Sequence, residues 1–264
     1  MKSCVRCYIY VLPLLFTVSC FARQAVDTIP IKFDTSSVQA KVPLQESNSA
    51  PPLSAVIIPM GAMAYGFVKL DNNALTRLDL EARNEFYSEH PHRQFIVDDY
   101  LQFAPGAAVF ALSGLAINGK NSLIDQSGIY LLSNIILNST TQSLKRITAV
   151  TRPDGTPNAF PSGHAAEAFA SAEFLRREYG EQSVWYTVSG YTVAVSVGML
   201  RMYNNRHWLS DVIAGAGLGV LSTQASYWLY PKIKKLFSGK SNNNALILPT
   251  YNKDIVGFGM LKNF

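Results

Sequence analysis

Residues 161–179 of this 264-residue chain read PSGHAAEAFASAEFLRREY. Pro161, Ser162 and Gly163 are typical of a loop that ends at a helix, and serine is a common N-cap residue. The residues after them, from Ala165 to Tyr179, form a helix-like run. The stretch therefore predicts a helix whose N-terminus carries a serine, a glycine and a histidine.

Two clusters of cationic and acid–base side chains flank this helix start. On its N-terminal side, Lys145 is followed after six residues by Arg152. On its C-terminal side, Arg201 is followed after five residues by His207 and three residues later by Asp211. The chain has only four histidines, so the presence of two of them in these clusters indicates a chemical role.

The cationic residues suit a phosphate. A phosphoryl group in transfer spreads negative charge over three oxygens, so its site needs several fixed donors. Lys145, Arg152 and Arg201 are candidates, and arginine favours bidentate contact with phosphate. Backbone amides near Ser162 and Gly163 would point at an anion from the helix N-terminus, and glycine allows close approach. These residues are predicted to form a phosphate-binding cradle.

The remaining residues suit acid–base work. His207 and Asp211 are four residues apart, so on a helical turn they would lie on one face. A carboxylate there fixes the imidazole tautomer and stabilises the imidazolium of a nucleophile or base. His164 would then donate a proton to the leaving oxygen. Each cluster alone is more often a solvated charge, a helix cap or a surface ion pair, but together they predict one site.

In order and spacing, the three clusters resemble the tripartite signature of the type 2 phosphatidic acid phosphatase (PAP2) superfamily. That superfamily also holds bacterial non-specific acid phosphatases and vanadium haloperoxidases. The resemblance covers roughly residues 100–231, and it implies an all-α helical bundle. It also implies phosphate ester hydrolysis through a phosphohistidine, with no metal and no cofactor.

The resemblance assigns a role to each residue of the clusters. It makes His207 the nucleophile, Asp211 its orienting acid and His164 the general acid. The phosphate-binding residues that it implies are Lys145, Arg152, Ser162, Gly163 and Arg201. Leu200 stands where the family usually has a serine, so one hydroxyl donor is missing. The short linker Asp154–Phe160 resembles bacterial membrane-lipid phosphatases more than soluble acid phosphatases.

The N-terminus is typical of an export signal, predicted here for residues 1–22. Lys2 and Arg6 precede an apolar core, Cys7–Phe21, and cleavage is expected after Ala22. All three cysteines lie in this segment, so the mature chain is expected to have no disulfide. An alternative is lipidation at Cys20, since the residues before it faintly resemble a lipoprotein cleavage box.

Composition divides the rest of the chain. Residues 23–50 are predicted to be a flexible leader, 51–238 a single phosphatase domain, and 239–264 a tail. The tail alternates apolar and polar residues, which predicts a short β-hairpin. The net charge of +5 suits an anionic substrate or an anionic membrane face, and no motif indicates nucleic acid binding.

Several charge-free runs are long enough to cross a bilayer, for which about 20 apolar residues are needed. Glu167 and Glu173 would be costly facing lipid, so the runs alone leave a soluble bundle open. Basic residues follow the His164 helix and the last run, and the positive-inside rule makes that side cytoplasmic. The sequence thus favours a membrane-embedded bundle with transmembrane helices and a periplasmic site. The runs are Ser47–Val68, Tyr100–Gly119, Gln126–Leu144, Gln182–Leu200 and Val212–Pro231.

The function predicted from these features is removal of phosphate from an envelope lipid phosphomonoester or diphosphate at the periplasmic face of the inner membrane. Lipid A, undecaprenyl diphosphate, and phosphatidic acid or phosphatidylglycerophosphate are the candidate substrates. A soluble, broad-specificity periplasmic acid phosphatase is the main alternative. A vanadate-dependent peroxidase and a non-catalytic lipid-phosphate binder are further alternatives, and the oriented imidazole pair argues against the binder.

Overall fold

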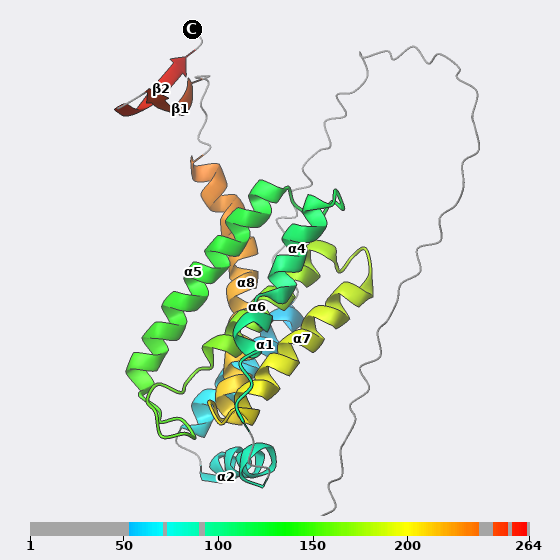
Figure 1. The fold of residues 1–264 in the computed structure, drawn as a ribbon, viewed down its shortest axis with the longest axis vertical. Helices are drawn as coiled ribbons and strands as arrows, with labels where there is room; N and C mark the ends of the chain where they lie inside the picture. The colour runs from blue at the N-terminus through cyan, green and yellow to red at the C-terminus, as the bar shows by residue number, and fades with distance from the viewer. Residues whose placement is uncertain (1–52, 71–72, 90–92, 238–244, 253–254, 263–264) are drawn as a thin grey trace, which may run out of the picture. The chain divides into compact units, whose positions relative to one another are not determined.

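The computed structural model describes residues 53–70, 73–89, 93–237, 245–252 and 255–262, so the predicted signal and leader lie outside it. The body is helical, as predicted (Figure 1). The helices are α1 Leu53–Lys69, α2 Asn73–Arg83, the π-helix η1 Asn84–Ser88, α3 Asp98–Leu101, α4 Ala104–Gly114, α5 Leu123–Thr148, α6 Gly163–Tyr179, α7 Val184–Tyr203 and α8 Leu209–Phe237.

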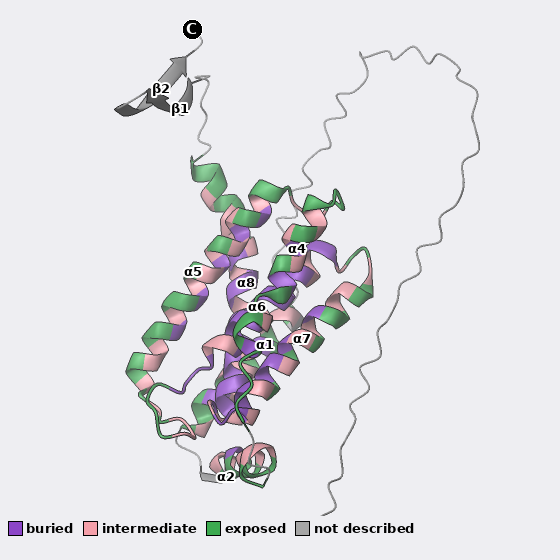
Figure 2. Ribbon diagram, in the orientation of Figure 1, coloured by how far each residue is buried: buried purple, intermediate pink, exposed green. Residues whose placement is uncertain are grey.

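Helix α6 is the centre of the bundle. It packs most extensively on α7 and α8, and also on α4 and α5. Figure 2 shows it largely buried, and its small residues allow this, since alanine lets neighbouring helices approach closely. The alanines of α6 that are almost completely buried are Ala165, Ala166, Ala168, Ala170 and Ala172.

Glycines on α8 bring it against the backbone of α6. A Cβ atom at Gly215 would lie 2.5 Å from the carbonyl oxygen of Ser162, and one at Gly219 would overlap the carbonyl oxygen of Ala166. At the same end of the pair, the Ser162 N–H donates a 3.0 Å hydrogen bond to the carbonyl oxygen of Asp211. This close packing fixes the starts of α6 and α8 next to each other.

Glu167 and Glu173, two of the three glutamates of α6, point into the bundle, not outward. Glu167 is buried and accepts a 2.9 Å hydrogen bond from the Tyr130 hydroxyl. Glu173 is buried and accepts bonds of 2.6 and 2.7 Å from Arg176 and of 2.7 Å from the Tyr191 hydroxyl. Each carboxylate therefore has protein partners in place of water.

The charge-free run Tyr100–Gly119 is not one continuous helix. Helix α4 covers only Ala104–Gly114, and it ends where Ala116 takes a left-handed φ of 61°. Eleven residues extend only about 16 Å. In the described part of the chain, no helix combines the length and the apolarity of a membrane-crossing segment.

The C-terminal tail contains the predicted hairpin. Strands β1 (Ala245–Asn252) and β2 (Ile255–Lys262) pair antiparallel, from Ala245 opposite Lys262 to Asn252 opposite Ile255.

Candidate phosphate site

The three clusters of the sequence meet at one end of the bundle. At this end α5 and α7 finish while α6 and α8 begin (Figure 1). A cavity of about 410 Å³ opens there between α5, α6, α7 and the residues that join α3 to α4. Six of the predicted site residues line it, namely Lys145, Arg152, Gly163, His164, Arg201 and His207.

Ser162 and Asp211 do not line the cavity but lie behind its wall. Ser162 is completely buried, and its hydroxyl accepts a bond from the Ala165 N–H at 3.4 Å, which is the N-cap role that its position predicts. Its hydroxyl is therefore engaged with the helix and not with the cavity. Gly163 begins α6 at the cavity wall, so the positive end of the helix dipole faces the space beyond it.

His207 and Asp211 approach each other as predicted, but not on one helical face. Helix α8 begins at Leu209, so His207 lies in the preceding loop. Its Nδ1 lies 3.6 Å from Asp211 Oδ2, longer than a hydrogen bond. The same oxygen accepts a 2.9 Å bond from the Trp208 N–H, as an acidic residue in the first turn does in a capping box. Since Nδ1 faces the carboxylate, Nε2 is the ring nitrogen on the cavity side.

Burial and neighbouring cations set the protonation of this pair. Burial, followed by the charges of Arg201, Lys145 and Arg152, holds the pKa of His207 well below 6.5. Burial raises the pKa of Asp211 to about 6, against the hydrogen bond from Trp208. At neutral pH the imidazole is therefore uncharged, with a free lone pair for attack.

The three predicted cations reach the cavity from different elements. Lys145, in the last turn of α5, donates a 2.7 Å bond to the carbonyl oxygen of Asn158. Burial, with the charge of Arg152, lowers the pKa of Lys145 to about 8. Arg152 comes from the loop after α5, and Arg201 from the last turn of α7. The buried Nε atoms of both arginines lack a hydrogen-bond partner among the described residues.

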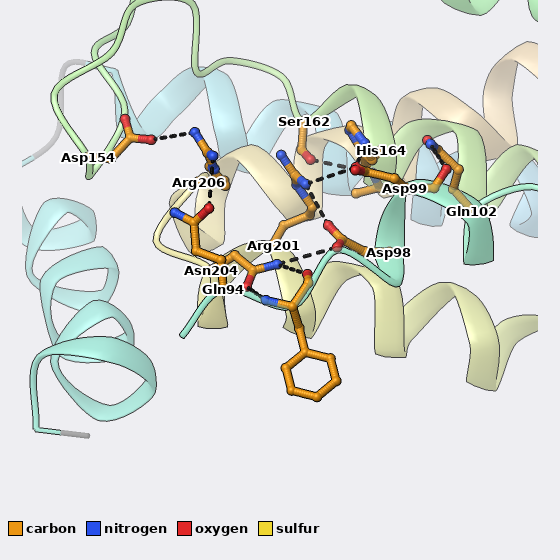
Figure 3. Close-up of polar contacts among 12 residues, drawn as sticks. Gln94, Asp98, Asp99, Gln102, Asp154, Ser162, His164, Arg201, Asn204 and Arg206 are labelled. Atoms are coloured by element: carbon orange, nitrogen blue, oxygen red, sulfur yellow. Dashed lines mark hydrogen bonds and ion pairs between the residues drawn. The ribbon is translucent and has the colours of Figure 1, made fainter. Parts of the chain in front are cut away.

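Two acidic residues that the motifs do not include contact the site (Figure 3). Asp98, in α3, lies 2.5 Å from Arg201 Nη1, and Asp99 lies 2.8 Å from His164 Nε2. The sequence carries one weak signal for them: two adjacent acids inside the otherwise apolar stretch of residues 95–103. Asp98 is 103 residues from Arg201, and Asp99 is 65 residues from His164, so spacing alone gives no reason to connect them.

Asp79 was likewise missed, and it supports the start of α8. Its carboxylate accepts bonds of 2.9 Å from the Ser210 N–H and of 2.8 Å from the Ser210 hydroxyl, and it pairs with Lys69 at 2.9 Å. Asp79 therefore ties α2 to the residue just before Asp211.

One group of acidic and histidine side chains is close enough for a metal ion to be considered. Among the described residues, this group is Asp98, Asp99 and His164, whose ligand atoms lie within 4.8 Å of one another. Arg201 already lies against both carboxylates, so a protein cation supplies balancing charge.

Part of the chain is similar to known proteins. Residues 126–235 match the model of the PAP2 superfamily. Lipid A 1-phosphatase of Porphyromonas gingivalis is 39% identical over 140 residues, which cover 50% of this chain and 30% of that protein. Bacitracin transport permease protein BcrC of Bacillus licheniformis is 34% identical over 99 residues, covering 36% of this chain and 47% of that protein. The chain thus spans less than half the length of these relatives.

Two solved structures also resemble the chain, each at 21% identity. Aquifex aeolicus LpxE gives a TM-score of 0.45 over 57% of this chain and 94% of that one. A transmembrane PAP2 type phosphatidylglycerolphosphate phosphatase from Bacillus subtilis gives 0.46 over 67% and 98%. The helical core over residues 126–235, in which all three motifs meet at one cavity, thus matches the PAP2 superfamily.

Proposed function

We propose that this protein is an envelope lipid phosphatase that works through a phosphohistidine on His207 and uses no metal ion. The observation that carries the proposal is the buried, neutral imidazole of His207. Its Nδ1 faces the Asp211 carboxylate, while three cations line the cavity beside it. A surface ion pair needs neither the burial nor the surrounding cations.

The proposed reaction has two transfers. Nε2 of His207 attacks phosphorus, the bond to the leaving oxygen breaks, and His164 gives that oxygen a proton. Asp211 stabilises the imidazolium that forms. Water then attacks phosphorus, the P–N bond breaks, and the water proton returns to His164, so phosphate leaves and both histidines are restored.

The cradle supplies the electrostatic part of catalysis. Lys145, Arg152 and Arg201 would contact the equatorial oxygens, on which negative charge spreads in the transition state. Ser162 and Gly163 would contribute the N-terminus of α6: Ser162 by capping the helix, and Gly163 by its backbone amide at the cavity wall. Three fixed cations provide the charge that a divalent ion provides in many phosphatases.

The apolar side chains exposed on the outer faces of the bundle support a membrane location. The outer faces of α1, α5 and α7 expose large apolar residues, among them Ile58, Leu131, Ile135, Trp185 and Val195. The runs 53–68, 127–144, 184–200 and 212–231 lie within helices and contain no charged residue. Such a belt is suited to acyl chains, and we propose that it lies in the bilayer. The site residues lie outside these runs, at the helix ends and in loops.

The charge at the two ends supports an orientation. Arg176 and Arg177 end α6, and Lys232, Lys234 and Lys235 lie near the end of α8, away from the cavity. The positive-inside rule makes that end cytoplasmic and the cavity periplasmic, in agreement with the export signal predicted for residues 1–22. We further propose residues 51–238 as the catalytic domain of an inner-membrane protein and 239–264 as an accessory tail.

The cavity suggests which lipid phosphate is preferred. Besides the cradle, four amide side chains line it: those of Asn134, Asn138 and Gln142 on α5 and that of Gln102 after α3. Amides both donate and accept hydrogen bonds, so they suit the hydroxyl groups of a sugar better than a prenyl chain. Together with the name of the Porphyromonas relative, this favours a sugar-linked lipid phosphate such as lipid A over undecaprenyl diphosphate or phosphatidic acid.

The test is phosphate release from these lipids by the purified protein, with His207→Ala compared with wild type. We expect His207→Ala to lose turnover and the acid-labile phosphoenzyme, and Asp211→Asn to remain folded but slow. His92→Ala, outside all three motifs, is the matched control and should keep full activity. Excess chelator should leave the wild-type rate unchanged. Wild-type turnover by His207→Ala, or activity restored only by a divalent metal, would overturn the mechanism.

A further inference from the structure

The acidic pair Asp98–Asp99 lies outside the three motifs yet contacts a residue of two of them. The segment that carries it runs from residue 93 into α3 and crosses the cavity end of α7, since Asn204 Nδ2 donates a 2.7 Å bond to the carbonyl oxygen of Phe95. The Phe95 N–H in turn donates a 2.8 Å bond to Asn204 Oδ1. These two bonds fix the segment in place, so the acids that follow it have defined positions (Figure 3).

Asp98 and Arg201 form a buried ion pair that a further hydrogen bond supports. Both side chains are buried, at 1% and 9% exposed, and Nη1 lies 2.5 Å from Oδ2. Asn204 Nδ2 lies 3.3 Å from the other carboxylate oxygen. A buried charge pair with such support holds the guanidinium in one orientation, whereas an exposed pair would not.

Asp99 engages one specific nitrogen of His164. Its Oδ1 lies 2.8 Å from Nε2, with the side chains 53% and 31% exposed. A carboxylate can only accept, so Nε2 carries the hydrogen. Nδ1 is then the nitrogen available for proton exchange at the cavity.

We propose that Asp98 and Asp99 are positioning residues of this site, with Asp98 orienting Arg201 for phosphate and Asp99 orienting His164 so that Nδ1 serves the leaving oxygen. This inference rests on the proposed phosphatase function and adds to it two residues that the motifs do not contain. In the first transfer Nδ1 of the imidazolium loses its proton to the leaving oxygen while Nε2–H stays bonded to Asp99. In the second, Nδ1 takes the proton from water.

The charges around His164 agree with this role. Burial, and then the charge of Arg201, lower the pKa of His164, while Asp99 and then Asp98 raise it. Lys145, Arg152 and His207 line the same cavity, and Glu167 lies one turn further along α6. Asp99 therefore opposes the cationic surroundings that disfavour the imidazolium, and its loss should make His164 a proton donor over a narrower pH range.

A competing explanation is that the pair is a plug. Asp98 and Asp99 would then occupy Arg201 and His164 in place of phosphate, and substrate would have to displace them. The two explanations predict opposite changes: loss of a positioning residue lowers kcat or weakens binding, whereas loss of a plug lowers KM.

The first test is Asp99→Asn, which removes the charge and keeps the shape. We expect the alkaline limb of the kcat profile to move about one pH unit lower, so that kcat at pH 7.5 falls about tenfold with little change in KM. Asp99→Glu should move the alkaline limb of the kcat profile part of the way back toward its wild-type pH. Glu181→Gln removes one charge from an exposed residue at the far end of α6 and should leave the profile unchanged.

An NMR titration of His164 in the same variants gives a readout that does not depend on turnover. Its pKa should fall in Asp99→Asn and not in Glu181→Gln, even if no lipid is hydrolysed, which separates failure of this inference from failure of the proposed function. An unchanged His164 titration with an unshifted profile would refute the role of Asp99, and a lowered KM would establish the plug.

The role of Asp98 is tested by inhibition with inorganic phosphate. Asp98→Asn should raise the inhibition constant about tenfold because Arg201 loses its fixed orientation, while the alkaline limb stays in place. Circular dichroism and thermal unfolding of the variant check that it folds. If Asp98→Asn misfolds, Asp98→Glu, which keeps the charge but moves it, should still weaken phosphate inhibition. Unchanged inhibition in a folded variant would contradict the proposal.

Discussion

At the scale of single residues, the site depends on a histidine that stays neutral among cations. His207 is buried and has Lys145, Arg152 and Arg201 nearby, all of which disfavour its protonation. In the proposed mechanism, a bound phosphate brings the opposite charge and favours the imidazolium that forms on attack. The cations that prepare the nucleophile are thus the ones that would stabilise the transferring group.

Lys145 gives the residue-scale prediction. Because its pKa is lowered to about 8, it loses its charge above that pH, and the cradle then has two cations in place of three. The inhibition constant of inorganic phosphate should rise about tenfold between pH 7 and pH 9.5. In Lys145→Arg it should stay nearly flat, because arginine remains charged in this range. The measurement is phosphate inhibition of lipid hydrolysis across pH.

Lys120→Arg is the matched control for this titration. Lys120 is half-exposed, pairs with Glu181 at 2.8 Å and belongs to the opposite end of the bundle. It should show the wild-type rise. An equally steep rise in Lys145→Arg would mean that another group controls the alkaline limb.

The residues that the sequence predicted belong to short motifs in which reactive or charged side chains stand at a fixed spacing. Lys145, Arg152, His164 and His207 could be found this way, and the fold brings them to one cavity. Asp99 could not, because its contact with His164 exists only after α3 and α6 pack together. Asp99 and His164 are 65 residues apart in the sequence, so no local pattern of residues connects them.

At the scale of elements, helix starts show what local sequence can and cannot determine. The start of α6 was predicted from Ser162, since an N-cap serine acts on the residues that directly follow it. The start of α8 was not. His207 was expected on a helical turn, but Asp211 accepts from the Trp208 N–H and Asp79 binds Ser210, so the helix begins after the histidine.

The contact between α6 and α8 gives the element-scale prediction. A Cβ at Gly219 would overlap the Ala166 carbonyl oxygen, so Gly219→Ala must push the two helices apart. We expect a loss of about 1–3 kcal/mol in the free energy of unfolding, the usual range for overpacking a tight core. Because the same helices hold the site, activity should fall as well. Thermal and denaturant unfolding provide the measurement.

Gly61→Ala is the matched substitution, since it makes the same change in α1 where no atom lies within 4 Å of the added Cβ. Alanine is the better helix former, so this variant should be about 0.5–1 kcal/mol more stable than wild type. Equal effects of the two substitutions would show that helix propensity decides the outcome and not the contact with Ala166.

At the scale of the whole molecule, charge is sorted along the bundle. The described helices carry charge-free runs in their middle, cations around the cavity at one end, and a second basic group near Arg177 and Lys234 at the other. The sequence could predict the runs and the basic groups, because both are local compositions. It could not predict that the run Tyr100–Gly119 is broken, since no glycine or proline marks the left-handed Ala116 at which the helical segment ends.

This sorting predicts which end of the protein faces outward. Helix α6 alone is about 25 Å long, so the loop before it and the turn after it lie at opposite ends of the bundle. We therefore place one cysteine at each end, Pro157→Cys in the exposed loop before α6 and Glu181→Cys in the exposed turn after it. The background carries Cys4→Ser, Cys7→Ser and Cys20→Ser, so that no native thiol reacts.

In intact spheroplasts, an impermeant thiol probe should label Pro157→Cys at once and Glu181→Cys only after lysis. The physical reason is that basic residues are retained on the cytoplasmic side, which leaves the cavity end outside. The reverse pattern would mean an inverted bundle with a cytoplasmic site. Equal labelling of both before lysis would mean that the belt of apolar residues is not in the bilayer. In that case nucleotides should be hydrolysed as fast as lipids, since the acyl chains would no longer contribute to binding.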